Sequence, residues 1–172
     1  MIISIIGFMG AGKSTIAQRL SGLLSSPFID LDLYIETKEG ISIQEIFANS
    51  GETAFRKMEE RYLKELLNIN TQKVLLLSLG GGALTSDFNR QLIKDNTICI
   101  YLKASADTLV KRLSKSRKIR PLISGTEPSD LKDQIESLLN KRQKQYEDTA
   151  SITIDIDGLS TNGIIERILC LI

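Results

Sequence analysis

The chain has 172 residues, 42% of them hydrophobic, which is typical of one globular domain with a substantial core. Its 22 Lys and Arg balance 21 Asp and Glu, so the net charge of +1 excludes the long-range field by which a protein holds nucleic acid or an anionic membrane. Two cysteines without metal-ligand spacing and a complete lack of histidine exclude zinc chemistry and histidine catalysis.

The chain opens with an apolar run at 2–6 that predicts a core strand and not a signal peptide. No apolar run is long enough to span a membrane, so we expect a cytoplasmic protein with no membrane partner. Further strands are predicted over 27–30, 73–79, 97–102 and 151–156. Helices are predicted over 13–25, 32–39, 43–49, 52–68, 86–95, 105–115, 129–148 and 161–171. This alternation favours a three-layer α/β/α fold, a five-stranded parallel sheet flanked by helices.

Residues 7–14 match the phosphate-loop pattern G-x-x-x-x-G-K-[ST], with Gly7, Gly12, Lys13 and Ser14 at its fixed positions. The motif follows a predicted strand and opens a predicted helix, where inward N–H groups and the helix N-terminus attract phosphate. Lys13 would bridge the β- and γ-phosphates, and the Ser14 hydroxyl would bind magnesium. The alternative, a glycine-rich turn that only joins strand to helix, is disfavoured by this match of pattern and context.

Two carboxylates, Asp30 and Asp32, follow the second predicted strand, at the sheet edge where ligands gather in parallel sheets. If the chain stays extended, both side chains project to the same side, near the phosphate loop. One would hold magnesium through water and the other would accept a hydroxyl proton. The alternative is a solvated turn or a helix N-cap.

Arg56 and Glu59 lie three residues apart on a predicted helix and are therefore neighbours on one face. Taken alone, this spacing favours a surface salt bridge. In the functional interpretation, Glu59 fixes the guanidinium group while Arg56 presents it to a substrate carboxylate. Spacing does not decide between the two.

The third predicted strand ends in Gly80, Gly81 and Gly82, where many phosphate-loop ATPases have an aspartate. Three glycines allow a small polar ligand to approach the backbone and its N–H donors, although a plain flexible turn has the same composition. Further along, residues 115–128 break the helical periodicity with charges, one glycine and two prolines. A segment of this kind inside a compact domain is typical of a functional loop, and a bland solvated loop is its alternative.

Taken in order, these motifs resemble the shikimate kinases, small members of the nucleoside-monophosphate-kinase-like P-loop group. The resemblance is carried by residues 7–14, Asp30-Leu31-Asp32, Phe55-Arg56 with Glu59, Gly80-Gly81-Gly82, Arg120-Pro121-Leu122, and Arg142 four residues before Tyr146. It implies one P-loop kinase domain over 1–172, with a substrate-binding segment at about 32–60 and a mobile lid at about 113–126. The implied reaction is transfer of the ATP γ-phosphate to the 3-hydroxyl of shikimate, with Mg²⁺, in aromatic amino acid biosynthesis.

The resemblance also implies a role for individual residues. Asp32 corresponds to the substrate-hydroxyl ligand and base, Arg56 and Arg142 to the pair that clamps the shikimate carboxylate, and Gly81 to a backbone contact with the ring hydroxyls. The substrate-binding set is Asp32, Arg56, Glu59, Gly80, Gly81, Gly82 and Arg142.

On the nucleotide side, Lys13, Asp32 and Arg120 form the implied catalytic set. Arg120 resembles a lid arginine over the phosphates, while Arg112 and Asp157 correspond to the two walls of the adenine site. The ATP-binding set is Gly10, Ala11, Gly12, Lys13, Ser14, Thr15, Arg112, Arg120 and Asp157, with Ser14 and Asp30 as magnesium partners.

Three other classes compete with this interpretation. A gluconate or nucleotide kinase shares the loop and the lid but does not predict Arg56, the three glycines and Arg142 together. A guanine-nucleotide switch requires Asn-Lys-x-Asp, and the nearest match, 140–143, lacks the aspartate. A nucleic-acid motor is disfavoured by the neutral charge and the few aromatic residues, so we expect a monomeric small-molecule kinase with no nucleic-acid partner.

Overall fold

The computed structural model describes residues 1–69, 73–115 and 130–172. Its elements follow in the order β1 (Ile2–Ile6), α1 (Lys13–Leu23), β2 (Phe28–Asp30), α2 (Leu31–Glu39), α3 (Ile43–Leu67), β3 (Leu75–Ser78), the 3₁₀ turn η1 (Ala83–Thr85), α4 (Asp87–Asn96), β4 (Ile98–Lys103), α5 (Ala106–Leu113), α6 (Leu131–Thr149), β5 (Ile152–Asp155) and α7 (Thr161–Leu169). All five predicted strands and the predicted helices are present; the 3₁₀ turn was not predicted, and α7 ends two residues earlier than predicted.

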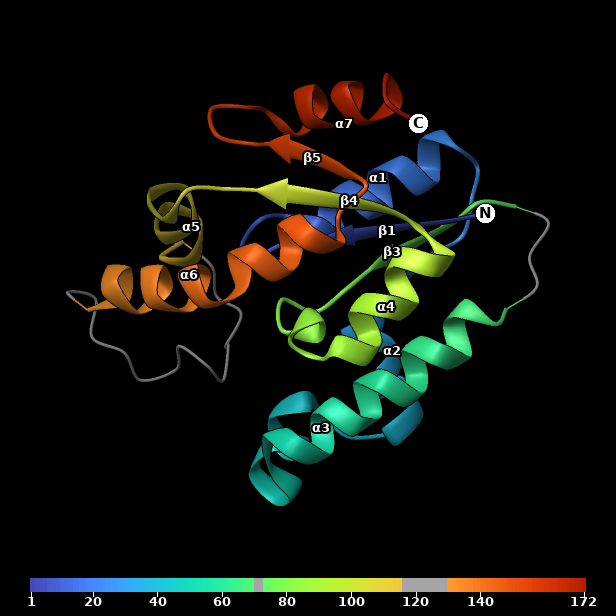
Figure 1. Ribbon diagram of the computed structural model, residues 1–172, viewed down its shortest axis with the longest axis vertical. Helices are drawn as coiled ribbons and strands as arrows, with labels where there is room; N and C mark the ends of the chain where they lie inside the picture. The colour runs from blue at the N-terminus through green and yellow to red at the C-terminus, as the bar shows by residue number, and fades with distance from the viewer. Residues whose placement is uncertain (70–72, 116–129) are drawn as a thin grey trace.

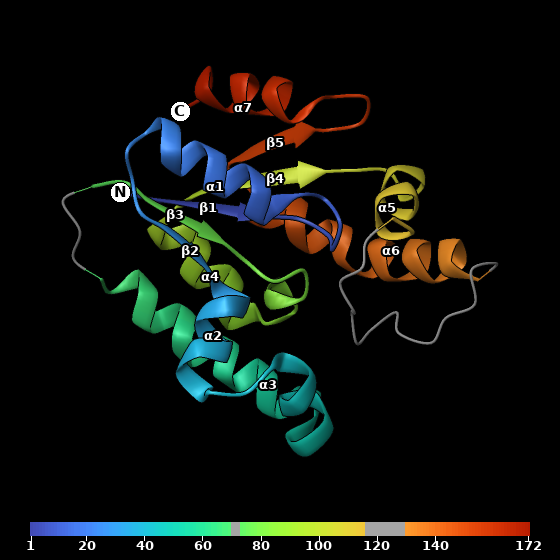
Figure 2. The same ribbon diagram turned by 180° about the vertical axis from the view of Figure 1, so that it is seen from behind.

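The five strands form one parallel sheet in the order β2-β3-β1-β4-β5. Figures 1 and 2 show α4 and α6 on one side of the sheet and α1 and α7 on the other. The predicted three-layer α/β/α architecture is therefore confirmed. Every residue of β1 and β3 is buried, as expected for central strands covered on both faces.

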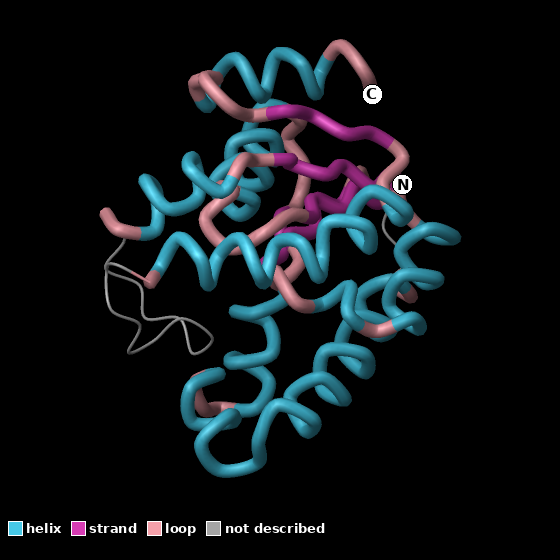
Figure 3. The backbone as a smooth tube through the Cα atoms, turned by 60° about the vertical axis from the view of Figure 1, so that its left-hand side comes forward, coloured by secondary structure: helices cyan, strands magenta, loops and turns pink. Residues whose placement is uncertain are grey.

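Helices α2 and α3 pack on each other and project beyond the β2 edge of the sheet, as Figure 3 shows. A capping box starts α3: the Ser42 backbone N–H donates to the Glu45 carboxylate at 2.8 Å, and the Ser42 side chain accepts from the Glu45 N–H. Gly51 interrupts α3 with a left-handed φ of 77°, so the helix consists of two parts with a kink between them. This matches the prediction of a short helix that ends just before Gly51 and a long one after it.

The sheet brings the ends of β1, β2 and β3 together because its strands are parallel. β1 leads into the phosphate loop, β2 into the aspartates and β3 into the three glycines. These three neighbouring strand exits form one edge, where the crevice of an open α/β sheet binds ligands. No helix in the described parts of the chain is long and apolar enough to cross a membrane.

Candidate active site

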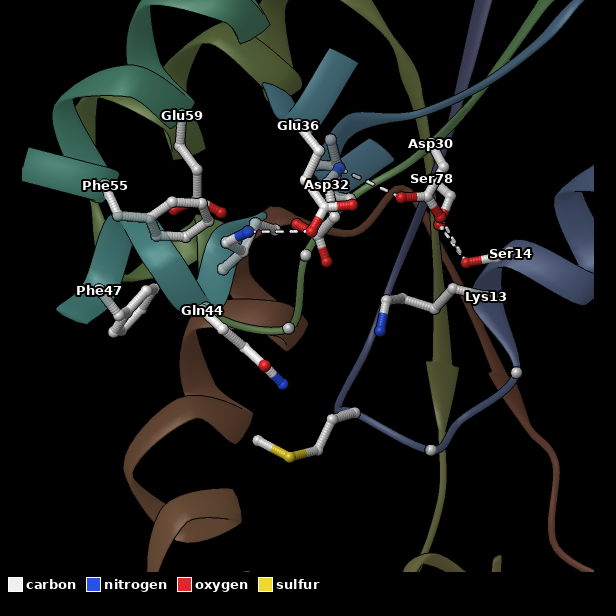
Figure 4. A pocket seen from close by; sticks show the side chains of 18 of the residues that line it. Lys13, Ser14, Asp30, Asp32, Glu36, Gln44, Phe47, Phe55, Glu59 and Ser78 are labelled. Atoms are coloured by element: carbon white, nitrogen blue, oxygen red, sulfur yellow. Dashed lines mark hydrogen bonds between the residues drawn. The ribbon is translucent and has the colours of Figure 1, made fainter. Parts of the chain in front are cut away.

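A cavity of about 860 Å³ lies at this edge and is lined by residues from α1, α2, α3, α5, α6 and the three strand exits. Among its lining residues are the following members of the predicted site: Gly10, Gly12, Lys13, Ser14, Thr15, Asp30, Asp32, Arg56, Glu59, Gly80, Gly81, Gly82, Arg112 and Arg142. Figure 4 shows the Lys13 and Asp32 side chains directed into the same space. Groups far apart in the sequence thus converge on one cavity.

The phosphate loop has the conformation that its glycines allow. Gly12 is the N-cap of α1 and has a φ of 93°, a left-handed value that L side chains rarely adopt. The start of α1 therefore faces the cavity without a side-chain cap on its N–H groups. Lys13 Nζ donates to the Phe8 carbonyl at 3.1 Å, which holds the ammonium group across the loop. This cationic, donor-rich end of a helix suits a polyphosphate.

Asp30 makes two sets of contacts: it is the N-cap of α2, as the alternative predicted, and it also accepts a hydrogen bond from the phosphate loop. Its Oδ1 accepts from the N–H groups of Asp32 and Leu33 at 3.1 and 3.3 Å and caps α2. Its Oδ2 accepts from the Ser14 hydroxyl at 2.5 Å. Ser78, at the end of β3, lies 3.3 Å from the same hydroxyl. These oxygens are the ligand type that Mg²⁺ prefers.

The chain does not stay extended after β2, contrary to the condition we set for the two aspartates. Helix α2 begins at Leu31, because Asp30 caps it, so Asp32 lies in the first turn. Asp32 nevertheless lines the cavity, and a Cβ on Gly80 would lie only 2.7 Å from its Oδ1. The carboxylate therefore lies against the glycine segment.

Arg56 and Glu59 form an ion pair that is not on the surface. The Glu59 side chain is 1% exposed and that of Arg56 18%, so the surface alternative is wrong. Arg56 Nη2 also pairs with Glu52 at 2.9 Å, and Arg142, 7% exposed, donates from Nη1 to the Gly81 carbonyl at 3.2 Å. Burial raises the pKa of Glu59 to about 7 despite the opposing pull of Arg56, and one of its oxygens, Oε1, has no hydrogen-bond partner among the described residues.

The three glycines lie in close contact with their neighbours. A Cβ on Gly82 would lie 2.8 Å from Cζ of Arg56, and one on Gly81 would lie 3.0 Å from the backbone nitrogen of Met9. Side chains here would displace the guanidinium group and the phosphate loop. The segment is therefore a close-packed junction and not a plain flexible turn.

Three predicted residues lie elsewhere or are not described. Ala11 is buried outside the cavity lining, and its carbonyl accepts from Arg112 Nη1 at 2.9 Å. Asp157 accepts from the Ser105 N–H at 3.1 Å and lines a second cavity of about 440 Å³. Arg120 and most of the predicted lid lie outside the described residues.

Several residues that line the cavity were not predicted. Glu36, Gln44 and Phe47 line it from α2 and α3, and Figure 4 labels them. Their sequence positions have the spacing of ordinary helix residues. Phe55, quoted only as part of the motif with Arg56, lines the cavity too. Ser78 could have been predicted from the sequence, because it lies at the end of β3, close to where many P-loop proteins have an acidic residue.

A phosphate loop at a parallel-sheet edge, with a cavity that joins it to buried arginines and an aspartate, defines the class of small-molecule P-loop kinases. A family model described as shikimate kinase matches residues 9–172. The chain therefore belongs to the shikimate kinase family, whose members are ATP-dependent phosphotransferases.

Individual relatives agree with this assignment. The chain is 38% identical to the shikimate kinase of Flavobacterium johnsoniae, over 97% of this chain and 96% of the relative. It is 41% identical to that of Mannheimia succiniciproducens, over 99% and 94%. Among solved structures, shikimate kinase from Acinetobacter baumannii in complex with shikimate has a TM-score of 0.89 and 34% identity, covering 99% of this chain and 91% of that one. The enzyme from Bacteroides thetaiotaomicron has a TM-score of 0.91 and 31% identity, covering 99% and 97%.

Proposed function

We propose that this protein transfers the γ-phosphate of ATP to the 3-hydroxyl of shikimate in a Mg²⁺-dependent reaction, giving shikimate 3-phosphate and ADP for aromatic amino acid biosynthesis. The observation that carries the proposal is the convergence of Arg56, Arg142 and Asp32 on the glycine segment beside the phosphate loop. A hydroxy acid needs cations for its carboxylate and an acceptor for its hydroxyl proton, and this cavity offers both.

The nucleotide side of the cavity fits ATP and Mg²⁺. When bound, they supply the transferable phosphoryl group and neutralise part of its charge. Ser14 and Asp30 would hold the metal, because their oxygens already lie 2.5 Å apart at the loop. Residues Gly10 to Thr15 would surround the phosphates with N–H donors, and Lys13 would stabilise the charge that develops during transfer. Arg112 and Asp157 would enclose the adenine.

On the substrate side, Arg56 and Arg142 would bind the carboxylate and Gly81 would contact the ring hydroxyls. Asp32 would orient the 3-hydroxyl and accept its proton. Glu59 would act through Arg56, by holding the guanidinium group from the buried side. Since phosphoryl transfer needs positioning and charge more than covalent help, this arrangement is sufficient for catalysis once water is excluded.

The remaining assignments concern the whole chain. We propose one kinase domain over 1–172, a substrate-binding segment at 32–60, and a lid at 113–126 whose Arg120 closes over the phosphates. We further propose a monomer in the cytoplasm that has no nucleic-acid or membrane partner, in keeping with the balanced charge.

The direct test is ADP release by the purified protein with magnesium ATP and a panel of acceptors. Shikimate should give rapid turnover, whereas quinate, gluconate and nucleoside monophosphates should not exceed the acceptor-free rate. Omitting magnesium should abolish the shikimate-dependent rate. Preference for gluconate or a nucleotide would contradict the proposed substrate while leaving the kinase class intact.

A further inference from the structure

The Gly81 carbonyl accepts two hydrogen bonds from α6. Arg142 donates from Nη1 at 3.2 Å, and the Tyr146 hydroxyl is the second donor. The two residues are four positions apart and therefore lie on one face of the helix. α6 lies beside η1, the turn that follows the glycine segment, so this face meets the end of β3 (Figure 1).

We propose that Tyr146 is a positioning residue for the acidic substrate: its hydroxyl fixes the peptide between Gly81 and Gly82 and, with it, the arginine that shares the same carbonyl. The inference rests on the proposed function and adds to it a group that lies behind the site and does not line the cavity.

Packing alone does not require a tyrosine at this position. Tyr146 is 1% exposed, and its ring packs on that of Tyr101 with centroids 5.2 Å apart. Phenylalanine would fill the same space without a buried hydroxyl that needs a partner. Burial raises the pKa of Tyr146 to about 12, so the phenol remains protonated and can donate throughout the neutral pH range. Its hydroxyl is thus a permanent donor to a single backbone oxygen.

The direction of that carbonyl matters because a trans peptide is planar. The C=O of Gly81 and the N–H of Gly82 belong to the same plane and point in opposite directions. Anchoring the carbonyl toward α6 therefore directs the Gly82 N–H away from α6. Glycine has no side chain to restrict this plane, so the two donors on α6 supply the restriction that the residue itself lacks.

The surroundings leave little room for the segment to move. A Cβ on Gly80 would lie 3.1 Å from Oε1 of Glu59, one on Gly81 would lie 3.0 Å from the Met9 nitrogen, and one on Gly82 would lie 2.9 Å from Nη1 of Arg56. Rotation of the peptide would thus change the contacts of both the phosphate loop and Arg56. Since Arg142 loses its shared acceptor at the same time, the largest effect should fall on binding of the substrate carboxylate.

The test is Tyr146→Phe, which removes one hydroxyl and keeps the ring. We expect the KM and the calorimetric Kd for shikimate to rise by about 3- to 10-fold, the effect of losing one buried hydrogen bond. The KM for ATP should stay within about twofold, and the Gly82 amide resonance should shift in the ¹H–¹⁵N spectrum. The matched control is Tyr101→Phe, which removes the hydroxyl from the other ring of the pair and should leave shikimate binding unchanged.

Four results would overturn the inference: unchanged shikimate affinity in Tyr146→Phe, an equal change in Tyr101→Phe, a parallel rise in both KM values, or failure of Tyr146→Phe to fold. The last two would mean that the hydroxyl supports the whole structure. Failure of the proposed function is distinguishable, because the wild-type protein would then show no shikimate-dependent ADP release.

Discussion

Arg56 lies between two carboxylates of its own helix whose environments differ. Glu52 is 50% exposed, whereas Glu59 is 1% exposed. An exposed pair contributes little to stability, but a buried one leaves an uncompensated charge when either partner is removed. Glu59 therefore fixes the guanidinium group, and the exposed side of Arg56 remains near the cavity. Arg142, buried and bonded to Gly81, approaches the same segment from α6.

Truncating either arginine should weaken binding of the substrate. We expect Arg56→Ala and Arg142→Ala each to cost ~2 kcal/mol or more in shikimate binding, because each removes one partner of a desolvated charged pair. Steady-state kinetics would show this as a KM for shikimate raised by about 30-fold. Arg61→Ala is the matched control, since Arg61 lies on the same helix, is 61% exposed and pairs with Glu39. An unchanged KM in both cavity variants would refute the carboxylate clamp.

The buried Glu59 should make the stability of the unliganded protein depend on pH. Burial raises its pKa from 4.5 to about 7, so between these values the folded state holds a proton that the unfolded state has lost. This contribution to stability is complete below pH 4.5 and disappears as the pH rises through 7. Glu59→Gln is neutral at every pH and lacks this dependence.

Urea unfolding of both proteins between pH 5 and 8 measures the effect. We expect wild type to lose about 2–3 kcal/mol relative to Glu59→Gln over this range, because roughly two pKa units of the shift lie within it and each corresponds to about 1.36 kcal/mol. The difference should level off above pH 8. A wild-type protein that gains stability relative to the variant as pH rises would show that Arg56 outweighs burial.

At the scale of single elements, the kink at Gly51 divides α3 into two parts, and both parts contribute residues to the cavity. The part before Gly51 brings Gln44 and Phe47 to the cavity, and the part after it brings Phe55 and Arg56. The change of chain direction at Gly51 therefore lies between these two pairs of cavity residues. The backbone at Gly51 has φ 77° and ψ 172°, a region essentially restricted to glycine. The kink is therefore specified by one residue and contributes to the form of the substrate side.

Replacing this glycine should destabilise the protein although there is space for a side chain. No atom lies within 4 Å of a Cβ built at Gly51, so any cost comes from the backbone. We expect Gly51→Ala to lower the free energy of unfolding by about 1–3 kcal/mol. Gly22→Ala is the control, because Gly22 lies inside α1 with equally open space and should gain ~0.5 kcal/mol from helix propensity. Equal denaturation midpoints for the two variants would contradict the argument.

At the scale of the whole molecule, the fold could be predicted because its strands are short apolar runs and the segments between them have the periodicity of helices. The phosphate loop and the strand-exit residues followed from the rule that ligands gather at one edge of a parallel sheet. The burial of the Arg56–Glu59 pair could not be predicted, because a spacing of three residues is the same for a surface pair and a buried one. The spacing of Tyr146 from Arg142 was part of the resemblance, but its hydrogen bond could not be predicted, because its partner Gly81 is 65 residues away and only the packing of α6 brings them together.

The proposed function divides the cavity into a nucleotide side and a substrate side, so the stability of the folded protein should respond to each ligand separately. A ligand at about 100 times its Kd adds ~2.7 kcal/mol to the stability of the folded state. For a chain of this size each kcal/mol raises the melting temperature by about 2–4 °C, so ADP and shikimate should each raise it by about 5–10 °C. Lys13 lies in the phosphate loop, whereas Arg56 and Arg142 lie at the glycine segment.

Lys13→Ala should therefore lose most of the shift produced by ADP and keep that produced by shikimate, because only the phosphates need the ammonium group. Thermal unfolding at fixed ligand concentrations measures both shifts. Lys38→Ala serves as the control: Lys38 forms an exposed pair with Glu65, and its removal should preserve both responses. If Lys13→Ala lost both shifts equally, the loop and the substrate side would form one inseparable site, and the division of roles proposed for them would be wrong.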